Sequence, residues 1–255
     1  MKILRLGNSY ESDPNIPPES NKTAVADRLI AEATGQPVET TARTIWPDPG
    51  LPDLIEKWID RYEPDLVFLV VSSYWFTHVS LPLAIERRFG RVGKPIARAG
   101  DRLVHKPWLA RNRAFNAARN ATRGAIGGET HFTPEQVVQS MGSCVRRIVA
   151  HEEVALAVRG PRIAFATEGS AKAKRIGEER RGRVDRHMAE FCRQLHVEYI
   201  EYDTGVTPDA ARQEFQADMV HVTEVVHAEQ GRIEGEAMLR AYRGGYNASV
   251  ETNVD

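Results

Sequence analysis

Two short stretches near opposite ends of the 255-residue chain carry residue types that can do chemistry together. Near the start, the apolar run at residues 2–6 is followed by Gly7, Asn8 and Ser9, which leaves a hydroxyl just beyond a predicted strand. Near the end, Asp218 and His221 precede a predicted helix. An imidazole can accept the proton of a serine hydroxyl, and a carboxylate can orient the imidazole. We therefore expect a nucleophile, a base and its orienting partner.

Each of these residues also has a simpler role open to it. Asn and Ser favour turns because their side chains bond to nearby backbone, so Ser9 could do only that. Asp218 could cap the last helix. His221 could be a satisfied polar residue near the start of that helix. It is the joint occurrence of the three residues that favours catalysis.

The hydrophobic pattern predicts the elements that must position these residues. Five short apolar runs rich in branched residues predict buried strands, at residues 2–6, 37–43, 65–71, 162–167 and 196–202. Apolar residues at helical spacing predict helices between them and after them, at residues 21–33, 52–62, 174–194 and 223–242. Gly35 is a predicted C-cap. Such alternation predicts an α/β fold with a five-stranded parallel sheet and helices on both faces.

The strand order 2-1-3-4-5 would bring two polar loops into one cleft. Ligands of open parallel sheets lie beyond the carboxyl ends of the strands, where the strand order reverses. In this order the ends of strands one and three flank the reversal. We therefore predict substrate contacts from Asn8 after strand one and from Ser73, Tyr74 and Trp75 after strand three.

Residues 81–158 are too many for one crossover helix, so we predict one domain over residues 1–255 with a helical insertion there. The segment 87–128 holds eleven Lys or Arg and a single acid, Asp101. It is either a solvated helical surface or a basic rim that attracts an anionic substrate. The formal net charge of the whole chain is only -1, so we expect no nucleic-acid partner.

Composition and missing motifs exclude several other classes. The two cysteines, Cys144 and Cys192, do not suggest a disulfide framework or a zinc site. No stretch predicts a signal peptide or a membrane span, so we expect a cytoplasmic protein. The patterns GxSxG, GxGxxG and GxxxxGK[ST] are absent from the sequence, and His221 and His227 have the wrong spacing for a helical metal pair. We predict no cofactor and no metal.

The sequence resembles the SGNH (GDSL-type) hydrolases over nearly its whole length. The resemblance rests on the Gly-Asn-Ser turn at 7–9, the apolar strand at 64–69, and the Asp-Met-Val-His-Val-Thr segment at 218–223, which is its most specific part. It implies a flavodoxin-like three-layer α/β/α sandwich that hydrolyses esters through an acyl-serine on Ser9. It also implies an oxyanion hole formed by the backbone N–H groups of Ser9 and Gly50 and by an asparagine after strand three.

The chain departs from the family pattern after strand three. Where the family has Gly-x-Asn-Asp, this chain has Ser72, Ser73, Tyr74 and Trp75, so the amide donor is missing from its expected position. Ser73, the Tyr74 hydroxyl or His78 are candidate replacements. In the first block, Asn8 stands where Asp is more usual.

The leading hypothesis is a serine esterase acting on a small or acylated, possibly anionic substrate, such as a carboxylic ester or an O-acetyl group. One alternative is a binding protein for an anionic ligand, whose catalysis is weakened by the lost asparagine. Another is an O-acyltransferase, in which an acceptor other than water enters after acylation. The pattern does not reveal the oligomeric state.

Overall fold

A parallel β-sheet forms the centre of the protein, here seen in a computed structural model that describes residues 1–8, 16–78, 80, 85–90, 129–162, 171–201 and 222–251. The side chains of 171–173 and 245–251 are outside this description. The strands are β1 (Lys2–Gly7), β2 (Glu39–Thr44), β3 (Leu66–Val70), β4 (Ala155–Arg159) and β5 (Glu198–Ile200). They form one five-stranded sheet in the order β2-β1-β3-β4-β5, with all neighbours parallel. The predicted fold class and strand order are confirmed.

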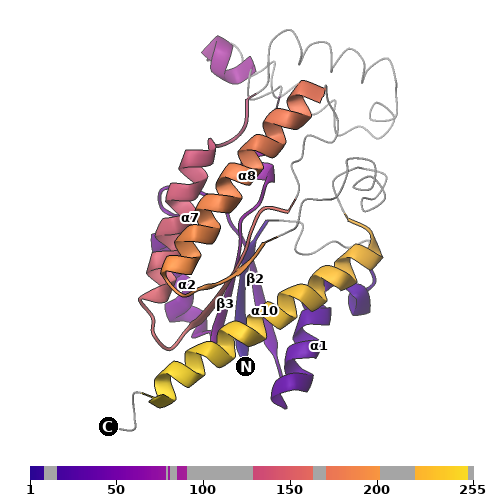
Figure 1. Cartoon of the computed structure of the whole chain (residues 1–255), viewed down its shortest axis with the longest axis vertical. Coiled ribbons are helices and arrows are strands. Elements are labelled where there is room, and N and C mark those ends of the chain that lie inside the picture. The colour runs from indigo at the N-terminus through magenta and orange to yellow at the C-terminus, as the bar shows by residue number, and fades with distance from the viewer. Residues whose placement is uncertain are drawn as a thin grey trace.

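Helices cover both faces of this sheet (Figure 1). On one face lie α2 (Leu51–Tyr62), α7 (Pro134–Val149) and α8 (Ala171–Gln194), with the one-turn helix α3 (Tyr74–Thr77) packed against α7 and α8. On the other face lie α1 (Lys22–Thr34) and α10 (Glu224–Glu251), which pack against each other, and the short helix η2 (Pro18–Ser20) adjoins both. The result is the predicted three-layer α/β/α arrangement.

The alternation of side chains along each strand explains why both faces need a helical cover. In β1, Leu4 and Leu6 belong to the hydrophobic core under α2, α7 and α8, whereas Ile3 belongs to the core under α1 and α10. Strand β3 is buried along its whole length, as expected for a central parallel strand. Arg5 lies on the α1/α10 side of β1 and is also buried.

Most predicted elements lie where the sequence places them, but the fourth strand is wrong. Strand β4 spans Ala155–Arg159 and not 162–167, and residues 163–170 are outside the described part of the chain. The run Ala155–Arg159 is apolar and ends at Gly160 and Pro161, where the missing proline N–H ends the ladder. The sequence pattern did contain this strand, but within the predicted insertion.

Because β4 lies earlier in the chain than predicted, the insertion predicted at 81–158 is shorter. Its last part is not an insertion, because α7 is the crossover helix that leads from β3 toward β4. This helix begins with a capping box in which the side chains of Thr133 and Gln136 bond each other's backbone N–H, followed by Pro134 at a permitted position. Of the basic segment predicted at 87–128, residues 91–128 are outside the described residues.

Two further features bear on the predictions made from composition. Across the residues that the structure describes, no helix is both long and apolar enough to cross a membrane. Cys144 on α7 and Cys192 on α8 are free and buried, and burial raises the pKa of each thiol to about 12. Helix α1 ends at Gly35 in the left-handed conformation, with φ of 68°, which confirms the predicted C-cap.

Helices α1 and α10 approach closely because α10 presents two glycines to α1. A Cβ atom added at Gly231 would lie 2.6 Å from the Lys22 carbonyl oxygen and 2.8 Å from Val25 Cβ. At Gly235 it would lie 3.1 Å from Ala26 Cα. Backbone atoms cannot move aside as a flexible side chain can, so glycine at 231 sets how close the two helices lie.

We expect Gly231→Ala to lower the free energy of unfolding by about 1–3 kcal/mol, because the added methyl group overpacks the contact with Lys22. Urea unfolding measures the effect. Gly244→Ala is the matched control in the same helix, since its Cβ position meets nothing within 4 Å. There alanine should stabilise the helix by up to about 1 kcal/mol. A Gly231→Ala variant as stable as the unchanged protein would contradict the close packing.

Candidate active site

The carboxyl ends of β1 and β3 are joined by a hydrogen bond between side chains. Asn8, the residue after β1, donates from Nδ2 to Ser72 Oγ at 2.7 Å. The same Ser72 oxygen accepts from the backbone N–H of Tyr74 at 3.3 Å. The Ser72 hydroxyl therefore connects the end of β1 with the start of α3, at the point where the strand order reverses. This is the position at which the sequence predicts a cleft.

The three predicted catalytic residues, Ser9, Asp218 and His221, lie outside the described residues. One chain neighbour of Ser9 and one of His221 are described. Asn8 directly precedes Ser9, and Val222 directly follows His221 shortly before α10 begins at Glu224. The predicted triad thus stays a prediction.

The start of α10 lies at the same edge of the sheet as the end of β1. Helix α1 leads from β1 to the parallel strand β2, so α1 must run back along the sheet and begin at the carboxyl edge. Near this start, Ser20 Oγ donates to Glu224 Oε1 at 2.6 Å, and the Lys22 N–H donates to His227 Nδ1 at 3.5 Å. The residues that flank the predicted triad therefore approach one edge of the sheet.

Gly50, the predicted glycine of the oxyanion hole, is the exposed residue directly before α2. The chain leaves β2 next to β1, because the Ile45 N–H donates to the Gly7 carbonyl at 2.7 Å. A Cβ atom added at Gly50 would meet nothing within 4 Å, so there is open space beside its backbone. Gly50 lies after β2 as predicted, and its part in an oxyanion hole stays a prediction.

The two other predicted contacts after β3 have different surroundings. Trp75 is 1% exposed and belongs to the hydrophobic core on the face of α2, α7 and α8, so its side chain packs beneath the surface of the protein. Ser73 is 5% exposed, and its carbonyl accepts from Thr77 Oγ1 at 2.8 Å. Its hydroxyl makes no hydrogen bond with any residue that the structure describes.

Tyr74 belongs to an aromatic cluster that the sequence did not predict as a unit. Its ring stacks on His78, with centroids 4.6 Å apart, and on His131, with centroids 5.8 Å apart. Trp46, just after β2, makes edge contacts with the Tyr74 and His131 rings at 6.3 and 5.3 Å and a tilted contact with Phe132 at 6.2 Å. We call Trp46, Tyr74, His78, His131 and Phe132 the aromatic cluster.

The cluster forms one side of the carboxyl edge, next to the Asn8–Ser72 bond. Trp46 is 39% exposed, and Tyr74, His78, His131 and Phe132 are all partly exposed. The chain before α7 is fixed to α3, because the Phe132 N–H donates to the Trp75 carbonyl at 3.0 Å. A ligand at this edge would meet flat, largely apolar surfaces with polar tips, which is typical of small-molecule sites.

The electrostatic surroundings hold His131 in its neutral form. Burial lowers the pKa of His131 from its ordinary value of 6.5, and the positive charge of Arg87 lowers it further. Arg87 donates to Glu129 Oε2 at 2.5 Å and to the His131 carbonyl at 3.5 Å. Near pH 7 this part of the cluster is therefore a neutral imidazole beside the Arg87–Glu129 ion pair.

No metal site is evident in the part of the chain that the structure describes. There, no group of three or more His, Cys, Asp or Glu side chains is arranged to hold an ion. The predictions that the protein needs no metal and no cofactor are not tested by this.

Comparisons with known proteins agree on the fold. No protein-family model matches the chain, and no curated protein matches it. Among solved structures, TesA matches with a TM-score of 0.54 at 11% identity, over 93% of this chain and 97% of TesA. A lipase/acylhydrolase from Enterococcus faecalis matches with a TM-score of 0.53 at 16% identity, over 94% of this chain and 96% of the other.

A GDSL-like lipase from Parabacteroides merdae matches with a TM-score of 0.53 at 12% identity, over 93% of this chain and 94% of that one. The three matches cover nearly the full length of both partners. At these identities they show a shared fold, the three-layer α/β/α arrangement that in this chain has the strand order β2-β1-β3-β4-β5.

We expect nuclear magnetic resonance titration to give His131 a pKa below 6.5, because burial and Arg87 both disfavour the imidazolium. Arg87→Gln should raise the pKa only part of the way to 6.5, since burial is the larger cause. A pKa lowered by folding contributes stability above pH 6.5, and this stability is lost as the pH falls through the folded-state value.

Arg183→Gln provides the matched control, because Arg183 bonds Glu135 and is not among the causes that lower the His131 pKa. It should leave the His131 pKa unchanged. A His131 pKa at or above 6.5, or one that does not respond to Arg87→Gln, would contradict the described environment.

Proposed function

We propose that this protein is a serine hydrolase that cleaves a carboxylic ester or an O-acyl group, such as O-acetyl, through an acyl-serine intermediate. The observation that carries the proposal is the hydrogen bond from Asn8 to Ser72. It joins the ends of the two strands that flank the reversal, at the residue directly before Ser9. The segment that contains Asp218 and His221 leads into α10, whose start lies at the same edge. The fold shared with lipases and with a lipase/acylhydrolase supports the proposal.

The proposed reaction has two steps. His221 takes the proton of Ser9 as the oxygen attacks the carbonyl carbon, while Asp218 holds the imidazole and stabilises its charged form. The tetrahedral intermediate then breaks the ester bond, and His221 protonates the leaving alcohol. Water, deprotonated by His221, attacks the acyl-serine and releases the acid with Ser9 restored. In an O-acyltransferase, another hydroxyl compound would replace water in the second step.

The negative oxygen of the intermediate needs donors, and the family's asparagine is absent. We assign two of the donors to the backbone N–H groups of Ser9 and Gly50. For the third, Ser72 Oγ accepts from Asn8 Nδ2 and from the Tyr74 N–H, which hold it at the junction of β1 and α3, and the ring of Tyr74 is stacked within the aromatic cluster. Ser73 lies between these two residues in the sequence, and its hydroxyl makes no hydrogen bond to a described residue. We therefore assign the third donor to Ser73.

The aromatic cluster is the proposed wall for one side of the substrate. Tyr74 provides the contact, with Trp46 as its exposed neighbour, and Trp75 has no part in it because it is buried. Asn8 is proposed to hold the turn and not to bind substrate directly, since its Oδ1 atom is buried.

A fluorophosphonate probe should label the protein, and Ser9→Ala should abolish the labelling, because only an activated serine reacts rapidly with such a probe. Intact-mass spectrometry measures the adduct. Ser143→Ala is the control, as this partly exposed serine on α7 bonds the Gln139 carbonyl within its own helix. It should label like the unchanged protein.

A folded protein that does not label would sink the hydrolase proposal. It would favour instead the binding protein for an anionic ligand, which the missing asparagine motivates.

Ser73→Ala should lower kcat by about 10²-fold with little change in KM, because an oxyanion donor acts mainly in the transition state. Hydrolysis of a short-chain ester measures both constants. Ser73→Thr keeps the hydroxyl and should retain most of kcat. Equal kcat values for Ser73→Ala and the unchanged protein would show that another group provides the third donor.

A further inference from the structure

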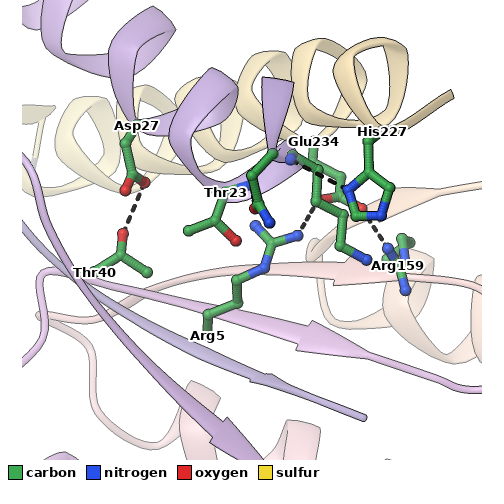
Figure 2. Close-up of polar contacts among 9 residues, drawn as sticks. Arg5, Thr23, Asp27, Thr40, Arg159, His227 and Glu234 are labelled. Atoms are coloured by element: carbon green, nitrogen blue, oxygen red, sulfur yellow. Dashed lines mark hydrogen bonds and ion pairs between the residues drawn. The ribbon is translucent and has the colours of Figure 1, made fainter. Parts of the chain in front are cut away.

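A buried carboxylate on α10 binds two arginines from two different strands (Figure 2). Glu234 is 0% exposed, and its two oxygens accept from the guanidinium groups of Arg5 in β1 and Arg159 at the end of β4. Arg5 is 1% exposed, and its guanidinium also lies over the ring of Phe68 in β3, 4.6 Å from the ring centroid. We call Glu234, Arg5 and Arg159 the ion triad.

Burial of the ion triad does not by itself imply that the triad stabilises the fold. Two guanidiniums and one carboxylate lose much of their hydration when buried, and their attraction only roughly offsets that loss. Apolar residues of similar volume often serve as well or better for stability. What the triad adds is direction, because charge-assisted hydrogen bonds require defined donor and acceptor positions.

These directional bonds can fix the position of α10 along its own axis. The apolar contacts of α10, such as those of Ala237 and Met238, are nondirectional, whereas the carboxylate of Glu234 must meet donors from β1 and β4 at once. A polar contact also links the neighbouring helix α1 to the edge strand β2. There Thr40 Oγ1 donates to Asp27 at 2.7 Å, although burial raises the pKa of that carboxyl. Figure 2 shows both contacts within the same layer between the helices and the sheet.

If α10 shifted at Glu234, the start of the helix, which lies at the carboxyl edge of the sheet, would shift with it. A helix is stiff, and Glu224, the first residue of α10, lies about 15 Å from Glu234 at 1.5 Å per residue. At that end, Ser20 and the Lys22 N–H contact Glu224 and His227. Arg5 lies in the strand that continues to Asn8, the residue before Ser9. The triad therefore joins the strand that leads to the proposed nucleophile with the helix that follows the proposed base.

We propose that Glu234 is a positioning residue, whose bonds to Arg5 and Arg159 hold α10 in the register that brings the histidine segment to the serine turn. This inference rests on the proposed function for its catalytic consequence, but not for the register of α10 itself. If the triad served stability alone, replacing all three charges together would leave kcat and the position of α10 unchanged.

The test is the triple variant Arg5→Met, Arg159→Leu and Glu234→Leu, compared with Met238→Leu. The triple variant removes the three paired charges together, and Asp27, whose pKa is raised by burial and lowered in part by Arg5, keeps its bond from Thr40. We therefore expect cooperative unfolding with a Tm close to that of the unchanged protein. Its kcat for a short-chain ester should fall at least 10-fold while KM changes less than about 2-fold, because the register affects chemistry more than binding. Met238→Leu changes the same helix face without touching the triad and should keep kcat.

A second measurement reports the register without catalysis. Spin labels at Val225→Cys and Leu54→Cys, which are 76% and 41% exposed, join the start of α10 to α2 across the sheet. Cys144 and Cys192 are buried with a raised pKa and should stay unlabelled. Pulsed electron resonance should give one narrow distance for the unchanged triad and a shifted or broader one for the triple variant.

The two readouts separate the possible failures. A folded triple variant with an unchanged distance, or with unchanged kcat, overturns the positioning role. If the unchanged protein has no serine hydrolase activity, the proposed function fails and the distance alone decides the register of α10. Should the triple variant not fold, Arg159→Met removes one of the two bonds at a side chain that is 11% exposed, and the same two measurements apply.

Discussion

The reversal of strand order between β1 and β3 is the constraint on which the candidate site depends. Because the strands are parallel, the chain leaving β1 leads to α1 on one face and the chain leaving β3 leads to α3 and α7 on the other. These two connections diverge, so polar side chains can meet between the ends of β1 and β3. The bond from Asn8 to Ser72 shows that they do.

The two faces of the sheet contribute to that edge in different ways. On the face of α2, α7 and α8, an apolar core that includes Trp75 supports α3, and the aromatic cluster lies above it. On the face of α1 and α10, the core contains charge, and Glu234 joins two strands to one helix. Apolar packing, which is nondirectional, supports α3 under the aromatic cluster. Charge-assisted hydrogen bonds, which are directional, join β1 and β4 to α10.

The general architecture could be predicted from the sequence because it follows from local patterns. Branched apolar runs and helical spacing are properties of a few neighbouring residues, and Gly35 ended α1 as its position indicated. The fourth strand was missed because the short run Ala155–Arg159 lies within residues 81–158, which the pattern assigned to a helical insertion. The aromatic cluster was missed except for Tyr74 and His78, since His131 and Phe132 reach the edge only through the placement of α7. Trp46 had a usable signal in its position directly after a strand.

The ion triad shows a second limit of sequence reading. Arg5 interrupts an apolar strand and Glu234 lies among polar helix residues, and neither pattern reveals that they meet across 229 positions of sequence. Pairing between charges that far apart depends on the packing of α10 against the sheet. The same holds for the predicted triad, whose members are also widely separated and depend on the same two elements.

A crystal structure of the protein after treatment with a phosphonate inhibitor tests the central claim most directly. The predicted result is a phosphorus atom bonded to Ser9 Oγ, with a His221 ring nitrogen at hydrogen-bond distance, roughly 2.6–3.2 Å, from the serine oxygen. Asp218 should contact the other ring nitrogen. A phosphonate on a different residue, or His221 facing away from Ser9, would contradict the claim and leave only the fold.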